Sequence, residues 1–194
     1  MSYGDESIDD FLDSVASQKV TPAGGTAGAL VGAIGTALCE MVCIHTVGGD
    51  EHGDGADELA EVRKDLQSQR EFLLELSNRD AEVVDDLFGA NRDETDRSVT
   101  MKRATGVPLT IAEACLSVLE QAAVVTEKGN RNAAPDAGTG SFFVHSALRA
   151  SVFTVRTNLN HLSDPAFTEQ METQAADIER SADIAFERVL SNIE

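Results

Sequence analysis

A long apolar seam constrains the fold of this chain more than any other feature of its sequence. From Leu59 to Leu87, apolar residues recur at alternating spacings of three and four, which is the period of one helix face and not of a strand. A seam held over about thirty residues is typical of a long bundle helix. Two seam positions are polar, Gln69 and Asp80. A carboxylate there must be paired, capped or functional, because burying it bare is costly.

Further helices are predicted on both sides of this seam. A first helix follows an N-cap at Ser7, and a second follows the loop 20–26. The glycine-rich stretches at 45–56 and 89–91 are expected to be a loop and a helix end. The step Gly106-Val-Pro108 is expected to separate helices at 93–104 and 108–127. After a polar loop at 130–140, helices are expected at 141–162 and from 165 onward. We therefore predict an all-α fold, a bundle of about six or seven helices in a single domain over residues 1–194.

The charge of the chain excludes two classes of partner. Lys and Arg number 15, whereas Asp and Glu number 34, which gives a formal net charge of −19. Such a polyanion does not bind bare nucleic acid or an anionic membrane surface through its overall field. Scarce lysine with excess carboxylate is typical of salt-loving organisms, in which screening reduces self-repulsion. An acidic mesophilic protein is the alternative interpretation.

The cysteines and the N-terminus predict a cytoplasmic location. The three cysteines, Cys39, Cys43 and Cys115, are an odd set in a chain too large to need disulfides. The first residues lack the basic and apolar regions of a signal peptide. These features together favour a reducing compartment.

The segment 27–47 is apolar and nearly long enough to cross a membrane. Glu40 near its middle would cost about 2.5–3.5 kcal/mol on an insertion scale, so a buried helix of a bundle without membrane contact is expected. Three glycines in this helix indicate close approach by another backbone: Gly28, Gly32 and Gly35.

A metal site is conceivable at the end of the same helix. Cys39 and Cys43 share one helical face, but His45 points elsewhere and His52 lies in the acidic loop. Buried structural thiols among small residues are therefore favoured over metal ligands, and we predict no metal site.

Two carboxylates and two loops are candidates for a functional site. Asp80, and less clearly Glu40, either satisfies a neighbouring helix end or has a function. The loop Thr21-Pro-Ala-Gly-Gly-Thr26 leads into a helix start, where free N–H groups can hold a polar or anionic group. The alternative is a tight turn with Thr26 as the N-cap.

A second loop, at the start of another predicted helix, carries Asn130, Asn132 and Asp136. Arg149 and Arg156 lie seven residues apart and so share one helix face. They could meet the carboxylates of a ligand or simply the acids of this acidic chain.

Taken in order, these segments resemble the formiminotransferase-cyclodeaminase C-terminal domain family, which also includes stand-alone methenyltetrahydrofolate cyclohydrolases. Residues 21–26 resemble the family's Pro-Gly-Gly-Gly-Ser opening, and Asp80 falls where the family has an Asp late in its long helix. Three later segments resemble family segments in the same order: Ala104-Thr-Gly-Val-Pro-Leu109, then Gly129-Asn-Arg-Asn132 with Asp136-Ala-Gly138, then Val155-Arg-Thr-Asn158-Leu159 with Asp164.

The resemblance implies an all-helical homodimer that acts on a tetrahydrofolate derivative without a metal or other cofactor. The reaction is either cyclodeamination of 5-formiminotetrahydrofolate or hydrolysis of 5,10-methenyltetrahydrofolate. Asp80 is then the catalytic carboxylate, and either Arg149 or Arg156 holds the glutamate tail. The remaining substrate-binding residues implied by the motifs are Pro22, Gly24, Gly25, Thr26, Asn130, Asn132, Asp136 and Asn158.

Two departures from the family pattern motivate an alternative. Ala23 stands in place of a family glycine, and the family's Leu-Pro-Lys is absent at 89–92. The alternative is a helical folate-binding or interaction protein that kept the fold without the activity.

Overall fold

The computed structural model describes residues 2–47, 56–89 and 94–194. Over these residues the chain is all-α, with a 3-10 turn and no strand. Of the loop predicted at 45–56, residues 45–47 instead belong to α2 and residue 56 to α3, while residues 48–55, with His52, lie outside the described residues. Residues 90–91 of the helix end predicted at 89–91 also lie outside them. The elements in chain order are η1 (Tyr3–Asp5), α1 (Ile8–Val15), α2 (Gly24–Val47), α3 (Ala56–Phe88), α4 (Glu94–Lys128), α5 (Ala134–Leu159) and α6 (Pro165–Ile193).

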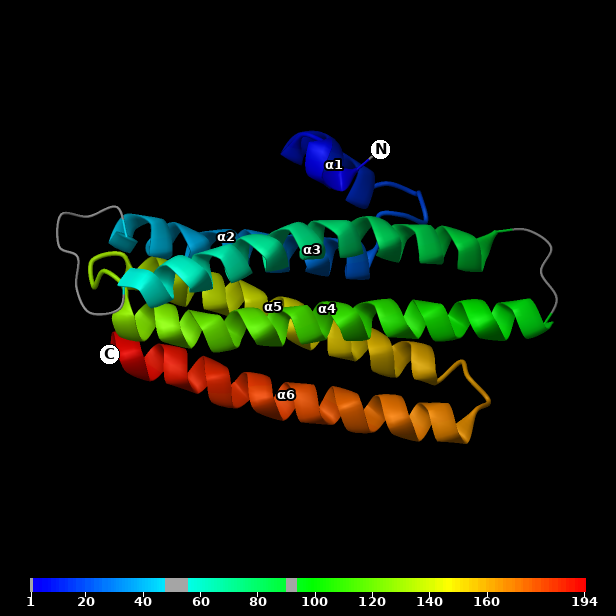
Figure 1. The fold of residues 1–194 in the computed structure, drawn as a ribbon. Helices are drawn as coiled ribbons and strands as arrows, with labels where there is room; N and C mark the ends of the chain where they lie inside the picture. The colour runs from blue at the N-terminus through cyan, green and yellow to red at the C-terminus, as the bar shows by residue number, and fades with distance from the viewer. Residues whose placement is uncertain (1, 48–55, 90–93) are drawn as a thin grey trace.

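Four of the helices form the body of the bundle (Figure 1). α2 packs against α3 and α5, and α4 packs against the same two helices, which closes a ring of four. α6 lies against α4 and α5. α1 lies apart from the bundle in Figure 1 and has no buried residue. As predicted, the Ser7 hydroxyl caps α1 by accepting a hydrogen bond from the Asp10 N–H at 3.1 Å.

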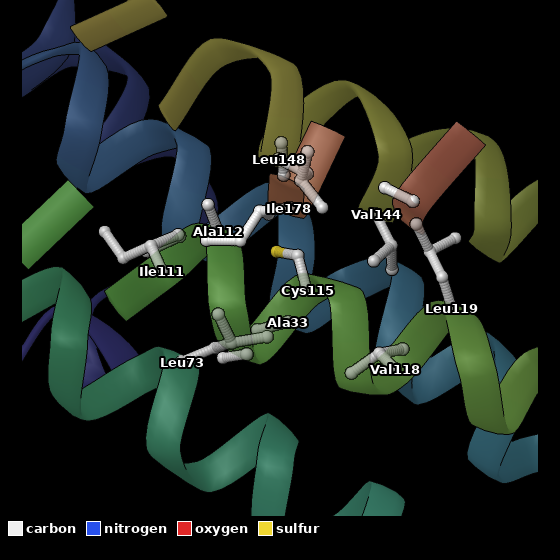
Figure 2. Close-up of a cluster of buried hydrophobic side chains, with 14 of the residues drawn as sticks. Ala33, Leu73, Ile111, Ala112, Cys115, Val118, Leu119, Val144, Leu148 and Ile178 are labelled. Carbon is white, nitrogen blue, oxygen red and sulfur yellow. The ribbon is translucent and has the colours of Figure 1, made fainter. Parts of the chain in front are cut away.

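The seam on α3 is confirmed as the inner face of that helix. Leu59, Leu66 and Leu73 are almost completely buried, and Asp80 is buried in the same row. Removing one such leucine side chain from water contributes about 1.5–3 kcal/mol. Figure 2 shows Leu73, Cys115 of α4 and Ala33 of α2 in one buried cluster, and a Cβ on Gly32 of α2 would contact both Leu73 and Cys115. The core is thus built from aliphatic side chains on five helices.

The predicted break at Pro108 is wrong, because α4 continues through it as one helix. Proline lacks an N–H, so the carbonyl four residues earlier, on Ala104, loses its helical donor. The side chain of Asn158 on α5 replaces that donor, with Nδ2 at 2.8 Å from the Ala104 oxygen. A contact from another helix therefore makes the continuous α4 possible.

The predicted loop at 130–140 is also too long, because α5 begins at Ala134. Its glycines are packing residues. A Cβ on Gly140 would collide with the carbonyl of Gly35 on α2, and a Cβ on Gly35 would collide with the carbonyl of Gly140. The expectation that α2 glycines mark a close backbone approach is confirmed at Gly35.

Two helices, Gly24–Val47 and the stretch Asp96–Lys128 of α4, are long and apolar enough to cross a membrane by length and composition. Half of the apolar window of the first, and 61% of that of the second, is buried inside the bundle. Core helices of a bundle pass the same test.

Candidate functional site

A cavity of about 420 Å³ lies where α2 and α4 begin and where α3 and α5 end. Each of these four helices contributes part of the wall, and most of the wall is apolar. The lining residues are Ala23, Gly24, Gly25, Asp80, Val84, Leu87, Phe88, Arg97, Met101, Ala104, Thr154, Asn158 and His161.

Asp80 is the acid in this wall, and only 5% of its surface is exposed. Its Oδ2 accepts a hydrogen bond from the Thr26 hydroxyl at 2.9 Å. Burial raises the pKa of the Asp80 carboxyl, while hydrogen bonds from the Thr26 side chain and backbone oppose that rise. Thr26 is the third residue of α2 and not its N-cap. Asp80 is therefore a buried carboxylate on a helix start, with an increased affinity for a proton.

The two glycines at the start of α2 have different roles. A Cβ on Gly25 would lie 2.7 Å from Cγ of Asp80, so any side chain there would displace the carboxylate. A Cβ on Gly24 would meet nothing within 4 Å. The absence of a side chain at Gly25 thus lets Asp80 lie against the start of α2, whereas Gly24 faces the open space of the cavity. Pro22 is buried beside this turn but does not line the cavity.

Asn158 lines the cavity and also holds the Ala104 carbonyl that Pro108 leaves without a helical donor. The two basic residues of the cavity wall, Arg97 and His161, were missed from the sequence. Their spacing is the signal that could have found them. Arg97 lies one turn before Met101 on α4, and His161 follows Asn158 by three residues.

The two arginines expected to bind a ligand tail do not line the cavity. Arg156 contacts Glu172 at 2.9 Å and Glu179 at 2.7 Å, both on α6. Arg149 lies 3.5 Å from the same Glu179. They share a helix face, and that face meets the acids of α6, as the second of the two interpretations expects. Glu40 is similarly paired, with its Oε2 accepting from Nε of Arg70 at 2.9 Å.

The second predicted loop lies at the opposite end of the bundle. The backbone N–H of Asn130 donates to the Thr46 hydroxyl at 2.8 Å, near the end of α2. Thr26 and Thr46 are twenty residues apart on that helix, which corresponds to about 30 Å. Asn130, Asn132 and Asp136 are thus not brought to Asp80 within one chain.

The thiols are not arranged as metal ligands. Burial raises the pKa of Cys39 to about 12 and that of Cys43 to about 11. A thiol binds metal as thiolate, and burial opposes that ionisation in both groups. Among the residues that the structure describes, no three His, Cys, Asp or Glu side chains gather into a metal-binding group.

Known proteins are similar to this chain along nearly its whole length. The family model described as Formiminotransferase-cyclodeaminase matches residues 7–177. The methenyltetrahydrofolate cyclohydrolase of Methylorubrum extorquens is 33% identical, over 98% of this chain and 97% of that protein. The formimidoyltransferase-cyclodeaminase of Rattus norvegicus is 23% identical over 98% of this chain but only 37% of its own length. The crystal structure of formiminotetrahydrofolate cyclodeaminase from Thermotoga maritima has a TM-score of 0.94 and 26% identity, covering 98% of this chain and 96% of that one.

Proposed function

Because this chain belongs to the formiminotransferase-cyclodeaminase family, we propose that it acts on the one-carbon unit of a tetrahydrofolate derivative, with Asp80 as the catalytic carboxylate. The observation that carries this proposal is the buried carboxylate in an otherwise mostly apolar cavity. Apolar walls suit the flat rings of a reduced pterin. A carboxylate suits the positive charge of the one-carbon centre.

Two reactions fit this arrangement. In one, N10 attacks the amidine carbon of 5-formiminotetrahydrofolate and ammonia leaves. In the other, water attacks the methenyl carbon of 5,10-methenyltetrahydrofolate to give 10-formyltetrahydrofolate. The cyclohydrolase name is carried by a relative that is 33% identical over 97% of its own length, whereas the cyclodeaminases are 22–26% identical. This difference favours the hydrolysis.

In the hydrolysis, Asp80 accepts a proton from the attacking water as the carbon–oxygen bond forms. The bond between the carbon and N5 then breaks, and the proton held by Asp80 goes to N5. The second proton of the water is released to solvent. Burial raises the pKa of Asp80, which makes its carboxylate a stronger base. Because the substrate is already a cationic electrophile, the reaction needs neither a metal nor another cofactor.

The test is the loss of methenyltetrahydrofolate absorbance with purified protein in molar KCl. We expect Asp80→Asn to lower kcat by about 10²- to 10⁴-fold, the usual contribution of a general base. Glu82→Gln is the matched control, because Glu82 is an exposed acid two residues away on α3 and its removal changes the net charge equally. Full turnover by a folded Asp80→Asn protein would refute the role of Asp80. Appearance of the same absorbance from 5-formiminotetrahydrofolate would identify a cyclodeaminase instead.

The alternative is a folate-binding protein without turnover. It is motivated by Ala23, which lines the cavity at the position of a family glycine. Saturable binding of a folate in the absence of either reaction would favour this alternative.

We also propose that the working form is a homodimer that meets through the outer faces of α1, α2 and α5. Among the described residues, nine of the fourteen large apolar side chains that are exposed lie on these helices: Ile8, Leu12, Val15, Val31, Ile34, Ile44, Phe142, Phe143 and Phe153. α2 has one acid, Glu40, and it is buried against Arg70. Two copies that each carry −19 repel one another unless they meet through uncharged surface. The exposed side of α2 offers such a surface, because the one acid of that helix is paired with Arg70, and a two-fold axis makes it self-complementary.

Molar mass measured by light scattering in molar KCl tests the dimer. Ile34→Asp together with Phe153→Asp is expected to give a folded monomer, because each adds a charge to the proposed interface. Ile184→Asp is the control, since Ile184 is 65% exposed on α6, away from that face. A dimer that survives the double change would place the interface elsewhere.

The location and the salt response are part of the same proposal. Three buried free thiols support a cytoplasmic, reducing environment. The charge of −19 supports adaptation to high salt. Thermal unfolding followed by circular dichroism is then expected to occur at much lower temperature in dilute buffer than in molar KCl. An equal melting temperature in both would favour an ordinary acidic protein.

A further inference from the structure

Arg97 differs from most of the described cations, because no carboxylate among the described residues lies within salt-bridge distance of it. Of the fourteen described Lys and Arg side chains, ten have such a partner. The other four are Lys19, Arg63, Arg97 and Arg131. Of these four, only Arg97 lines the cavity that contains Asp80. A guanidinium that has no ion-pair partner in the part of the chain that the structure describes is available to bind an anionic ligand.

Arg97 lies at the outer end of the cavity and Asp80 lies deeper. Asp80 precedes the end of α3 at Phe88 by eight residues, a rise of about 12 Å. α4 runs back along α3 (Figure 1), and Arg97 lies in its first turn. Phe88, which also lines the cavity, is 69% exposed. The long axis of the cavity therefore runs from a buried carboxylate to an aromatic ring and a cation at the mouth.

A tetrahydrofolate has the complementary order of groups. The one-carbon bridge lies on the reduced pterin, an aminobenzoyl ring follows, and glutamate carboxylates end the molecule. With the bridge at Asp80, the aminobenzoyl ring spans the apolar wall toward Phe88. The carboxylates then reach the guanidinium, whose planar donors match a carboxylate in two-point contact.

We propose that Arg97 binds the glutamate carboxylates and so determines specificity for folates over pterins that lack this tail. This inference rests on the proposed function and assigns the tail to Arg97, because Arg149 and Arg156 are held by the acids of α6. Arg97 does not touch the reacting carbon. It positions the substrate and acts on affinity without changing the chemical step.

The experiment compares two substrates, 5,10-methenyltetrahydrofolate and the corresponding methenyltetrahydropteroate, which has no glutamate. Arg97→Gln is expected to raise KM for the first about 10- to 100-fold, the usual effect of losing a charge-assisted hydrogen bond, with kcat unchanged. The same variant is expected to leave KM for the pteroate unchanged. Arg97→Lys, which keeps the charge but loses the planar fork, is expected to give an intermediate KM.

Arg63→Gln is the matched control, because it removes one unpaired positive charge from a helix surface outside the cavity. Equal effects of Arg97→Gln on both substrates, or on neither, would overturn the inference. If the wild-type protein turns over neither substrate, the proposed function fails, and the inference is judged by binding of 5-formyltetrahydrofolate in equilibrium dialysis. Weaker binding to Arg97→Gln but not to Arg63→Gln then supports it, and equal binding overturns it.

Discussion

The contact between Asn158 and the backbone at Pro108 gives a quantitative prediction about stability. Replacing Asn158 by Leu keeps the side-chain volume similar but removes the donor to the Ala104 carbonyl. A buried carbonyl left unpaired costs about 1–3 kcal/mol. Ala104 and Asn158 both border the cavity, so water can reach the carbonyl, and we expect the lower end, about 1–1.5 kcal/mol. For a protein of this size that lowers Tm by about 2–6 °C.

The prediction becomes specific in a double-mutant cycle with Pro108→Ala. Alanine at position 108 restores the N–H that donates to Ala104 within α4, so the Asn158 side chain becomes redundant. Asn158→Leu is then expected to cost less than about 0.5 kcal/mol in the background of Pro108→Ala, a coupling of roughly 1 kcal/mol. Urea unfolding of the four proteins in molar KCl, followed by circular dichroism, measures these values. An equal cost of Asn158→Leu in both backgrounds would refute the proposed role of the side chain.

Three further predictions concern buried groups. Burial raises the pKa of Asp80 in the folded chain, so the folded chain binds this proton more tightly than the unfolded chain. The stability that the bound proton provides is therefore lost as pH rises through the raised pKa. Asp80→Asn should unfold at higher urea than wild type at about pH 7, and the difference between the two midpoints should disappear at about pH 4. Gly25→Ala is expected to lower the urea midpoint because its Cβ meets the Asp80 carboxylate, whereas Gly24→Ala, facing open space, should leave it unchanged or raise it. Gly140→Ala, whose Cβ meets a backbone carbonyl of α2, is expected to lower the free energy of unfolding by about 2 kcal/mol or more. Gly106→Ala has room for its Cβ and is expected to gain about 1 kcal/mol of helix propensity. Similar urea midpoints for these two variants would contradict the packing argument.

The sequence predicted well the features that depend on a single helix. The period of the α3 seam identified the buried face of that helix, because buried positions on a regular helix recur once per turn. The same period showed that Asp80 is a charged residue at a buried position. On α6 the buried residues from Met171 to Val189 repeat with the same period. The family resemblance is confirmed by the matching family model and by the similar crystal structure.

Features that depend on a contact between helices were predicted poorly. Pro108 signals a break unless another helix supplies the missing donor, and nothing local to residues 104–108 indicates that Asn158 does so. Gly138 and Gly140 signal a loop unless neighbouring helices pack close enough to require them, as α6 does at Gly138 and α2 does at Gly140. For the same reason, the sequence could not show that Arg156 is held by α6 and that Arg97 is not.

The cavity has a consequence for folding and for ligand protection. Its walls come from residues 23–25, 80–88, 97–104 and 154–161, so it is closed only when segments more than 130 residues apart have docked. A partly folded chain has no complete site, and a bound folate therefore stabilises only the fully assembled bundle. Ligand at one hundred times its Kd should then raise the free energy of global unfolding by about 2.7 kcal/mol. Backbone amides that exchange only through that global opening should slow by the same factor, about one hundred, including those at the far end of the bundle.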